Sequence, residues 1–205
     1  MSGAQVFVVD DQPAVLKALG RLLAAAGYRV SAYATAEDFL DAGHADDEGC
    51  LVLDLSMPGM DGPALQDALV ARASRLPVIF LTGHGDLESG IRAMKHGAAD
   101  FLTKPVDDIR LIAAIEVALQ RNRERRQADG ELAAIRARLH TLTPREAEVM
   151  NLVIEGLLNK QIAAALGTVE KTVKVHHARV MVKMAVKSVT ALVRLVDRAR
   201  SDGTT

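Results

Sequence analysis

The sequence is poor in aromatic side chains and in cysteine, and it contains no tryptophan. Aromatic residues make up only 3% of the 205 residues. The hydrophobic cores must therefore be built from Ala, Val, Leu, Ile and Met, and a ligand pocket lined by aromatic rings is not expected. The single cysteine, Cys50, cannot form an internal disulfide. It stands in the apolar run CLVLDL, where we expect it to pack as a small hydrophobic group.

Long apolar runs and secretion signals are also missing. No stretch approaches the roughly 18 apolar residues of a membrane-spanning helix. The start, MSGAQVFVVDDQ, has no basic segment, and its apolar run is too short for a signal peptide. The 49% hydrophobic and 25% charged residues are ordinary for globular proteins. We therefore expect a cytoplasmic protein without a membrane partner, with one large or two small domains.

The formal net charge of -1 conceals an uneven distribution of charged side chains. Residues 1–105 contain 14 acidic and 8 basic side chains, whereas residues 106–205 contain 12 acidic and 17 basic ones. The excess of basic side chains persists over residues 141–205, with 10 against 6 acidic. This asymmetry indicates an acidic domain followed by one that could bind a polyanion, although surface charge also serves solubility.

Over the first 120 residues, short apolar runs alternate with helical patterns. Strands are predicted at residues 5–9, 29–33, 50–53, 78–81 and 100–102. Between the first two, apolar residues from Val15 to Ala26 recur at helical spacing, and Gly27 provides a stop. Five strands alternating with helices predict an α/β fold with a parallel sheet covered on both faces. In such sheets the functional crevice lies at the carboxyl ends of the strands.

The rest of the chain has a purely helical pattern. Behind Pro105 four apolar residues recur at helical spacing, namely Ile109, Ile112, Ile115 and Leu119. The polar stretch that follows predicts a solvated helical linker over residues 121–140, in which Gly130 interrupts any coiled-coil seam. The segment TPRE at 143–146 is typical of a helix start with a capping box.

Three further helices are expected in the C-terminal region. Gly156 ends the helix that begins with the capping box, and Asn159 can cap the next. Gly167 then makes a tight turn. Longer helices are expected at about 170–184 and about 188–200 from the recurrence of apolar residues.

Polar side chains stand at the predicted carboxyl ends of four strands. They are Asp10 and Asp11, Asp54, Thr82, and Lys104. Three carboxylates brought together repel one another unless a cation lies among them, and Mg²⁺ prefers hard oxygen ligands. We therefore predict that Asp10, Asp11 and Asp54 hold Mg²⁺ or Mn²⁺. Asp54 would be the nucleophile toward a phosphoryl group, Lys104 would neutralise its charge, and Thr82 would donate its hydroxyl to the new phosphate.

Residues 1–120 resemble the receiver domain of response regulators. The motifs VVDDQ, LDLSMPGMDG, FLTGHGD and FLTKP match that family in order and spacing. The resemblance implies a flavodoxin-like doubly wound sheet and phosphotransfer from a sensor histidine kinase to Asp54. It also implies that the backbone carbonyl of Ser56 joins the metal site, and that Phe101 is a switch residue together with Thr82. The family often has Tyr at the position of Phe101, so burial rather than a hydroxyl hydrogen bond would drive the switch here.

Two positions flank the expected path of the water that removes the phosphate. Ser56 and His84 lie two residues beyond Asp54 and Thr82. We hypothesise that these two side chains set the lifetime of the phosphate. An exposed loop histidine without such a role is the alternative interpretation of His84.

A helix, a glycine turn and a second helix are predicted between residues 160 and 185. On the second helix, the outer face by helical spacing is formed by Lys171, Lys174, Val175, Ala178 and Val182. The inner stripe is formed by Val173, His176 or His177, Val180 and Met184. Lysine can bind phosphates or guanine, and Val and Ala can contact thymine methyl groups in a major groove. An ordinary helical bundle with a cationic surface explains the charge alone equally well.

The segment LTPREAEVMNLVIEGLLNKQIAAALGTVEKTVKVHHARVMVKM resembles the LuxR-type helix-turn-helix. With a receiver in front, the chain resembles the NarL/FixJ family of transcriptional response regulators, and its FixJ-, StyR- and TodT-like members in particular. This implies a receiver at 1–120, a linker at 121–140 and a four-helix DNA-binding domain at 141–205. The implied DNA-contacting residues are Lys171, Thr172, Lys174, Val175, His177, Ala178 and Arg179.

The same resemblance implies partners and two departures from the family pattern. Promoter DNA, RNA polymerase and a second copy of the chain are expected partners, with homodimers forming on phosphorylation or on DNA through the last helix. Val169 stands where the family usually has a capping Ser, so we expect Thr168 to cap the recognition helix instead. His177 stands where Arg is frequent, which would weaken one phosphate contact.

Other functional classes remain as alternatives to a non-enzymatic regulator. A phosphatase of the haloacid dehalogenase type needs Asp-x-Asp after its first strand, whereas Asp10 and Asp11 are adjacent. A ligand-binding quorum-sensing activator would share the DNA-binding domain but needs an N-terminal pocket, typically aromatic. A receiver whose output binds protein or RNA stays open at this stage.

Overall fold

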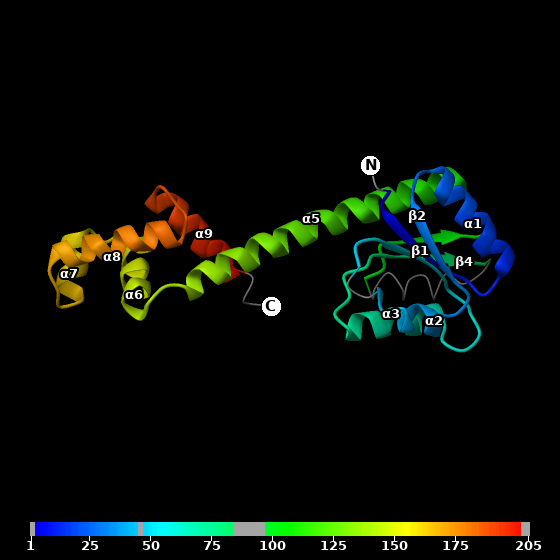
Figure 1. The fold of residues 1–205 in the computed structure, drawn as a ribbon, viewed down its shortest axis with the longest axis horizontal. Helices are drawn as coiled ribbons and strands as arrows, with labels where there is room; N and C mark the ends of the chain where they lie inside the picture. Colours follow the sequence, from blue (N-terminus) through cyan, green and yellow to red (C-terminus); the bar gives the residue numbers. More distant parts are fainter. Residues whose placement is uncertain (1–2, 45–46, 84–96, 202–205) are drawn as a thin grey trace. The chain divides into compact units, whose positions relative to one another are not determined.

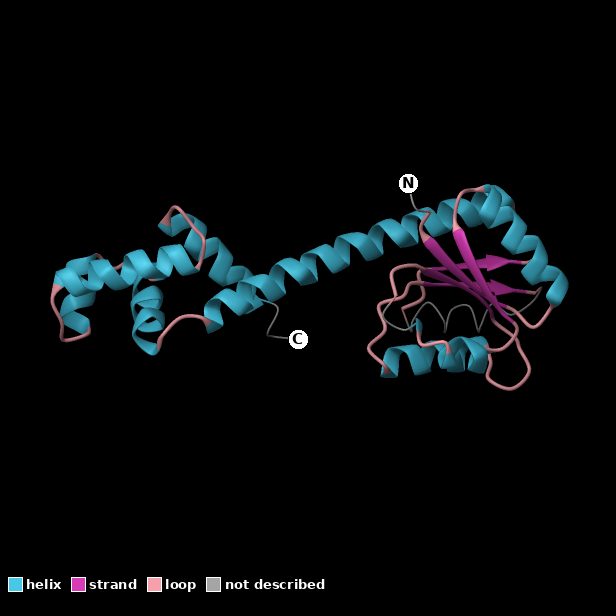
Figure 2. Ribbon diagram, in the orientation of Figure 1, coloured by secondary structure: helices cyan, strands magenta, loops and turns pink. Residues whose placement is uncertain are grey.

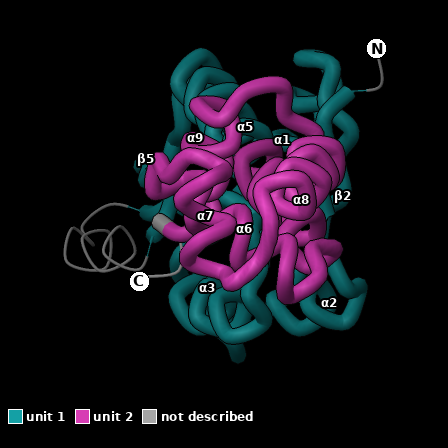
Figure 3. Tube along the Cα trace, turned by 90° about the vertical axis from the view of Figure 1, so that its left-hand side faces the viewer, with its two compact units in different colours: residues 1–125 teal, residues 126–205 magenta. Residues whose placement is uncertain are grey.

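The computed structural model describes residues 3–44, 47–83 and 97–201. The chain forms two compact units, Met1–Arg125 and Arg126–Thr205 (Figure 3). None of the helices in the described part of the chain combines the length and the apolar composition that a bilayer crossing requires.

The first unit contains a five-stranded parallel sheet with the strand order β2-β1-β3-β4-β5 (Figure 1). Its strands are β1 (Gln5–Val9), β2 (Arg29–Tyr33), β3 (Cys50–Asp54), β4 (Val78–Thr82) and β5 (Asp100–Thr103). Its helices are α1 (Pro13–Ala25), α2 (Ala36–Asp41), α3 (Gly62–Ala71) and the beginning of α5 (Asp108–His140). This order is that of the flavodoxin-like fold, so the predicted fold class is confirmed.

Helices cover both faces of the sheet, and each face has its own hydrophobic core. Successive residues of a strand point to opposite faces, so β3 sends Leu51 and Leu53 to one core and Val52 to the other. The first core is closed by α2 and α3, and the second by α1 and the start of α5 (Figure 2). Cys50 is buried in the second core, as its apolar surroundings predict.

The first helix begins and ends where its sequence predicts. Pro13 occupies the first helical position, and Gly27 has a φ of 90° just beyond the C-cap. A positive φ is accessible to glycine at little cost, so Gly27 can close the helix.

The prediction for the face of α5 that meets the sheet was wrong at one position. Ile109 is 79% exposed, whereas Leu111 is fully buried. A helix turns by about 100° per residue, so these two residues point in nearly opposite directions. The buried stripe continues through Ile115 and Leu119. Ile109 therefore lies outside the stripe that the sequence suggested.

The helix α5 is continuous for 33 residues and passes through Gly130 without interruption. The predicted helical linker is thus part of the same helix that packs on the sheet. Its middle is mostly exposed, as expected for a polar segment, but Leu132 and Ile135 are buried. The expectation of a solvated linker therefore holds only for part of its length.

The second unit contains four helices after α5. They are α6 (Pro144–Ile154), α7 (Asn159–Ala165), α8 (Glu170–Lys183) and α9 (Val189–Ser201). Apolar residues from all four meet in one core that includes Val149, Ile162, Val180 and Leu192. This arrangement confirms the predicted all-helical domain.

The helix starts of the second unit are partly as predicted. Thr143 and Glu146 form the predicted capping box of α6. Asn159 is not the cap of α7: it is the first helical residue, and the Leu158 backbone N–H donates to Gln161 Oε1 at 2.8 Å. The Gln161 side chain thus accepts from the backbone N–H at the start of the helix. Asn159 lies inside the helix and does not occupy the capping position.

The start of α8 also differs from the expectation. Val169 is its N-cap, in an extended conformation, and no side chain caps this helix start in the described structure. Thr168 therefore does not replace the missing serine, because it lies one residue too early for its hydroxyl to occupy the capping position. The Thr172 N–H donates to the Val169 carbonyl at 3.0 Å, which leaves the amides of Glu170 and Lys171 for solvent or for a ligand.

The C-terminal end of α8 gives a prediction on stability. Ala185 has a φ of 54°, and Val186 N–H donates to the carbonyl of Met181 at 3.0 Å. This is the helix-end position that favours glycine, because a Cβ makes a positive φ costly. We expect Ala185→Gly to stabilise the second unit by about 1 kcal/mol.

Amide hydrogen exchange in α8 of the full chain measures this change. The matched control is Ala134→Gly, an exposed position with helical geometry inside α5, where glycine should destabilise by about 1 kcal/mol. A change in stability of the same sign for Ala185→Gly and Ala134→Gly would contradict the prediction.

Candidate phosphorylation pocket and nucleic-acid interface

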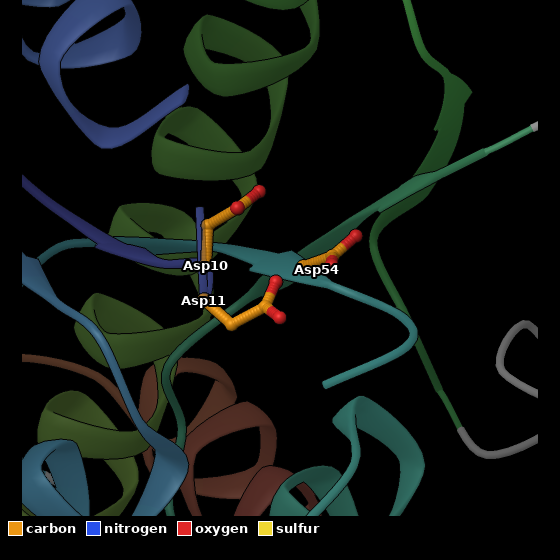
Figure 4. A group of neighbouring side chains, drawn as sticks. All are labelled: Asp10, Asp11 and Asp54. Atoms are coloured by element: carbon orange, nitrogen blue, oxygen red, sulfur yellow. The ribbon is translucent and has the colours of Figure 1, made fainter. Parts of the chain in front are cut away.

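Three carboxylates meet at the carboxyl edge of the sheet (Figure 4). Asp10 and Asp11 follow β1, and Asp54 is the last residue of β3. These strands are neighbours, so their ends bring one oxygen from each carboxylate within 4.8 Å of the others. Asp10 and Asp54 are buried, and Asp11 is more exposed. The structure thus brings together the acidic group that the sequence predicted.

Lys104 links two of these carboxylates. Its Nζ lies 2.6 Å from Asp10 Oδ2 and 2.8 Å from Asp54 Oδ1. Lys104 follows β5, and its backbone N–H donates to the carbonyl of Thr82 at 2.6 Å. The peptide bond between Lys104 and Pro105 is cis. The side chain therefore reaches across the end of β4 to the ends of β3 and β1.

The titration of the pocket reflects burial and close charges. Burial raises the pKa of the Asp54 carboxyl, Lys104 opposes this rise, and the charges of Asp10 and Asp11 add to it. Burial alone would lower the pKa of Lys104, but its hydrogen bonds to Asp10 and Asp54 outweigh that effect and raise it. Lys104 is therefore held as a cation between the two carboxylates.

The donor set fits a hard divalent cation. Mg²⁺ and Mn²⁺ bind carboxylate and carbonyl oxygens and usually retain water ligands. Asp10 already accepts from the Gln12 backbone N–H through Oδ1 and from Lys104 through Oδ2. Among the described contacts, Asp11 and Asp54 Oδ2 have no hydrogen-bond donor. These oxygens are the best placed to bind a cation, with Asp10 behind them.

The remaining predicted residues of the pocket lie around this group. Thr82 is buried at the end of β4, and its hydroxyl donates to the Gly83 carbonyl at 3.1 Å. Phe101 is half-buried and packs against the core on the α2–α3 face. Ser56 is exposed just after β3. His84, to which we assigned a role in phosphate lifetime, lies outside the described residues.

Sequence reasoning missed Gly62, the first residue of α3. A Cβ at this position would lie 2.5 Å from the Asp54 carbonyl oxygen and 2.9 Å from the Phe80 ring. Any side chain would thus displace α3 or the strand end that carries Asp54. The available signal was a glycine directly after Asp61, which caps α3. A glycine at a helix start is otherwise a poor choice, so its presence indicates a close approach.

A second candidate surface lies on α8. Five of the predicted residues are exposed there, namely Lys171, Lys174, Val175, Ala178 and Arg179. Thr172 and His177 are half-buried, and His177 Nδ1 lies 3.3 Å from Asn159 Oδ1 of α7. The inner side of α8 is formed by Val173, Val180 and Met184, which are fully buried. The predicted division of this helix into two faces is confirmed.

Two family models match the chain. Residues 6–116 match the response regulator receiver domain, and residues 140–196 match the luxR family of bacterial regulatory proteins. Nodulation protein W of Bradyrhizobium diazoefficiens is 43% identical over 94% of this chain and 85% of its own length. The transcriptional regulatory protein FixJ of Azorhizobium caulinodans is 43% identical over 93% of this chain and 90% of its own length.

The chain is a response regulator of the NarL/FixJ family. Such a regulator joins a phosphorylatable receiver to a LuxR-type DNA-binding domain and acts in transcription. A structure of the response regulator StyR matches with a TM-score of 0.90 and 45% identity, over 96% of this chain and 99% of that one. Full-length FixJ from B. japonicum matches with a TM-score of 0.62 and 40% identity, over 98% and 99%.

The exposed face of α8 carries an internal charge pair in this regulator. Lys174 Nζ lies 2.9 Å from Glu170 Oε1, one helical turn earlier. The hydrogen bond with Lys174 lowers the pKa of Glu170, so the glutamate is an anion at neutral pH. A negative charge at the start of α8 is favourable for the helix but opposes a DNA phosphate.

The last helix offers less free apolar surface than the sequence indicated. Leu192 and Val196 are buried inside the domain, whereas Leu195 and Ala199 are only half-buried. Packing within the domain therefore uses Leu192 and Val196 fully and Leu195 in part. A dimer contact through this helix would rest on Ala199 and the exposed part of Leu195.

A partly buried ion pair joins α6 to α8. Lys183 Nζ lies 2.6 Å from Glu146 Oε2, and the same oxygen accepts from the Thr143 backbone N–H at 2.9 Å. The Glu146 side chain is only 3% exposed. The hydrogen bond from Lys183, followed by that from Thr143, lowers the pKa of Glu146 to about 2.

This pair predicts a loss of stability in acid. The pKa of Glu146 in the folded domain lies below its ordinary value of 4.5, so its contribution is complete above pH 4.5. That contribution is lost as the pH falls from 4.5 toward 2. We expect Glu146→Gln, which keeps a capping amide but no charge, to destabilise α6 and α8 near neutral pH.

Amide exchange of wild type and Glu146→Gln, compared at matched pH, tests this prediction. The difference in opening free energy should shrink steadily below pH 4.5. Glu148→Gln, in the exposed pair with Arg145 on the same helix, serves as the control and should show little difference at any pH. A difference for Glu146→Gln that is independent of pH would contradict the assigned role of its charge.

Proposed function

We propose that this regulator receives a phosphoryl group on Asp54 from a sensor histidine kinase. The observation that carries the proposal is the position of Asp54, whose Oδ1 lies 2.8 Å from Lys104 Nζ and which has an oxygen within 4.8 Å of oxygens of Asp10 and Asp11. A nucleophilic carboxylate needs nearby positive charge to approach an anionic phosphoryl group. The deep burial of the strand end also limits access of water to the product.

The chain's own residues account for most of the transfer. An oxygen of Asp54 attacks the phosphorus, and the P–N bond to the kinase histidine breaks with its electron pair retained by the imidazole. Lys104 stays within hydrogen-bond reach of the developing negative charge. Asp10, Asp11 and Asp54 would hold the divalent cation together with the carbonyl of Ser56. A bound Mg²⁺ or Mn²⁺ supplies positive charge for the phosphoryl oxygens.

The phosphate signal is proposed to pass through Thr82 and Phe101. The Thr82 hydroxyl now donates to the neighbouring Gly83 carbonyl, and an acyl phosphate on Asp54 would offer it a stronger, charged acceptor. Turning Thr82 inward would shift the end of β4. Phe101 is half-buried, so it can gain burial when space opens beside Thr82.

We propose three segments for the signal path. A receiver at 1–120 is followed by a helical linker at 121–140 and a DNA-binding domain at 141–205. The limits of the two family matches, residues 6–116 and 140–196, support the outer segments, and residues 121–140 between them are helical throughout. In the cytoplasm, phosphorylation would favour a homodimer on promoter DNA that contacts RNA polymerase.

The proposed DNA contacts lie on the exposed side of α8. They are Lys171, Thr172, Lys174, Val175, His177, Ala178 and Arg179. Exposure of the cationic and small apolar members supports insertion of this helix into a major groove. His177 is partly engaged with Asn159, so we assign it a supporting contact.

Phosphorylation of Asp54 can be tested with a small phosphodonor and Mg²⁺. Intact-mass measurement should show one added phosphoryl group on the wild type and none on Asp54→Asn, which keeps the size of the side chain. Removal of the metal with a chelator should abolish the gain. Asp61→Asn, at the exposed cap of α3, is the matched control and should retain phosphorylation. No gain by the wild type, or an equal gain by Asp54→Asn, would contradict the proposal.

The charge pair on α8 predicts an effect on DNA affinity. Glu170→Gln frees Lys174 and removes a negative charge from the groove-facing side. We expect affinity for promoter DNA to rise about two- to five-fold, which corresponds to up to ~1 kcal/mol for an exposed charge. The rise should diminish with added salt because phosphate contacts are screened.

Gel-shift titrations of the phosphorylated protein at two salt concentrations measure this effect. Glu155→Gln removes the same charge from the end of α6, away from the α8 face, and should change affinity much less. An equal increase for both variants would assign the effect to net charge alone, and a decrease for Glu170→Gln would reject the proposed orientation of α8.

A further inference from the structure

A cavity of about 730 Å³ lies at the amino edge of the receiver sheet, at the opposite ends of the strands from Asp54. Val78, the first residue of β4, lines it, whereas Thr82 ends the same strand beside the phosphorylation pocket. Four residue steps along a strand separate the two by about 13 Å. The cavity is therefore distinct from the acidic pocket, and its volume is typical of small-molecule sites.

Two helices contribute matching stripes to this cavity. From α5 come Ala118, Arg121, Asn122 and Arg125. From α3 and its end come Gln66, Leu69, Val70 and Ala73. The α5 set follows the i, i+3, i+4, i+7 spacing of a single helix face, and Gln66, Leu69 and Val70 follow i, i+3, i+4 on α3, with Ala73 just beyond the end of that helix. The cavity thus has one polar, cationic wall and one largely apolar wall.

The charged side chains among the described lining residues are all arginines. Arg75, Arg121 and Arg125 line the cavity, and no Asp or Glu is among its described lining residues. Arg121 and Arg125 are one helical turn apart, so their side chains project to the same side. Guanidinium groups form paired hydrogen bonds with phosphate oxygens, which makes an arginine cluster of this kind suited to a phosphate group.

Asn122 provides a second, independent observation. Its side chain is 7% exposed, and its Oδ1 is buried without a hydrogen-bond partner in the described structure. A buried amide oxygen without a donor is costly, so it calls for a donor group. Asn122 lies between Arg121 and Arg125 on the cavity-facing stripe. The acceptor is therefore placed beside the cationic groups.

We propose that this cavity binds a nucleoside phosphate. The phosphate would meet Arg121 and Arg125, an N–H or O–H of the base or ribose would donate to Asn122 Oδ1, and the base would lie against Leu69, Val70 and Leu76. Inorganic phosphate can pair with the arginines but leaves the apolar wall uncovered. A neutral nucleoside can cover the apolar wall but leaves the arginines without an anion. The proposal does not depend on phosphorylation of Asp54.

Isothermal titration of the full chain tests the proposal, with AMP, GMP, ATP, GTP, inorganic phosphate and adenosine as separate probes. A metal-free buffer keeps the acidic pocket from contributing. We expect at least one nucleotide to bind at least tenfold more tightly than inorganic phosphate and adenosine. The double variant Arg121→Gln/Arg125→Gln should lose at least tenfold in affinity for that nucleotide.

Two variants separate the cavity from other effects. Arg123→Gln removes a charge from the same helix at an exposed position that does not line the cavity, and should alter affinity less than twofold. Asn122→Leu should reduce nucleotide affinity but leave the weak binding of inorganic phosphate unchanged. Circular dichroism of each variant confirms that α5 is still folded.

The location of binding gives an independent readout. Hydrogen exchange should show protection at residues 76–79 and 118–125 on nucleotide addition, and the same protection in Asp54→Asn. Binding of no nucleotide, equal binding of nucleotide and inorganic phosphate, equal losses for Arg123→Gln and the double variant, or protection confined to α8 would each overturn the proposal.

Discussion

The ammonium group of Lys104 between Asp10 and Asp54 is the contact on which the receiver pocket depends. Two buried carboxylates at the ends of neighbouring strands would repel each other without a cation. Lys104 also fixes three strand ends relative to one another, since it extends from β5 past β4 to β3 and β1. Transfer of a phosphoryl group to Asp54 would move the negative charge from the carboxylate to the phosphate oxygens. The phosphate and Asp10 would then compete for the ammonium group of Lys104. The contact that stabilises the unphosphorylated pocket would therefore change when Asp54 is phosphorylated.

The sequence could predict this pocket because all strands of a parallel sheet end at the same edge, so residues at successive strand ends lie close together. Asp10, Asp54, Thr82 and Lys104 are far apart in sequence, but each lies at or directly after the end of a strand, and parallel strands end at one edge. The strand limits were correct to within one residue for the same reason. The buried faces of helices were harder to predict than the strands. Ile109 fitted the predicted apolar stripe of α5, which did not include Leu111, but Leu111 is the buried residue. The position of the helix on the sheet decides which stripe is buried.

What the sequence could not provide are contacts that depend on distance alone. The need for glycine at position 62 arises because a Cβ there would lie 2.5 Å from the Asp54 carbonyl oxygen, and the sequence can indicate a close approach at this glycine but not its partner. The cap of α7 by Gln161 instead of Asn159 depends on where the helix begins, to a precision of one residue. The isolated acceptor of Asn122 likewise appears only when α3, β4 and α5 are placed around it.

Charge in the second unit shows why net charge is a poor guide to an interface. Lys183 belongs to the basic excess of this region, but its ammonium group forms an ion pair with the buried carboxylate of Glu146. Lys174 faces outward, yet Glu170 holds it in a pair along the helix. The field that a DNA phosphate meets is therefore set by which cations are already paired. An exposed pair is weak, whereas removing the partner of a buried carboxylate is costly. Lys174 can therefore exchange Glu170 for a phosphate more readily than Lys183 can leave the buried Glu146.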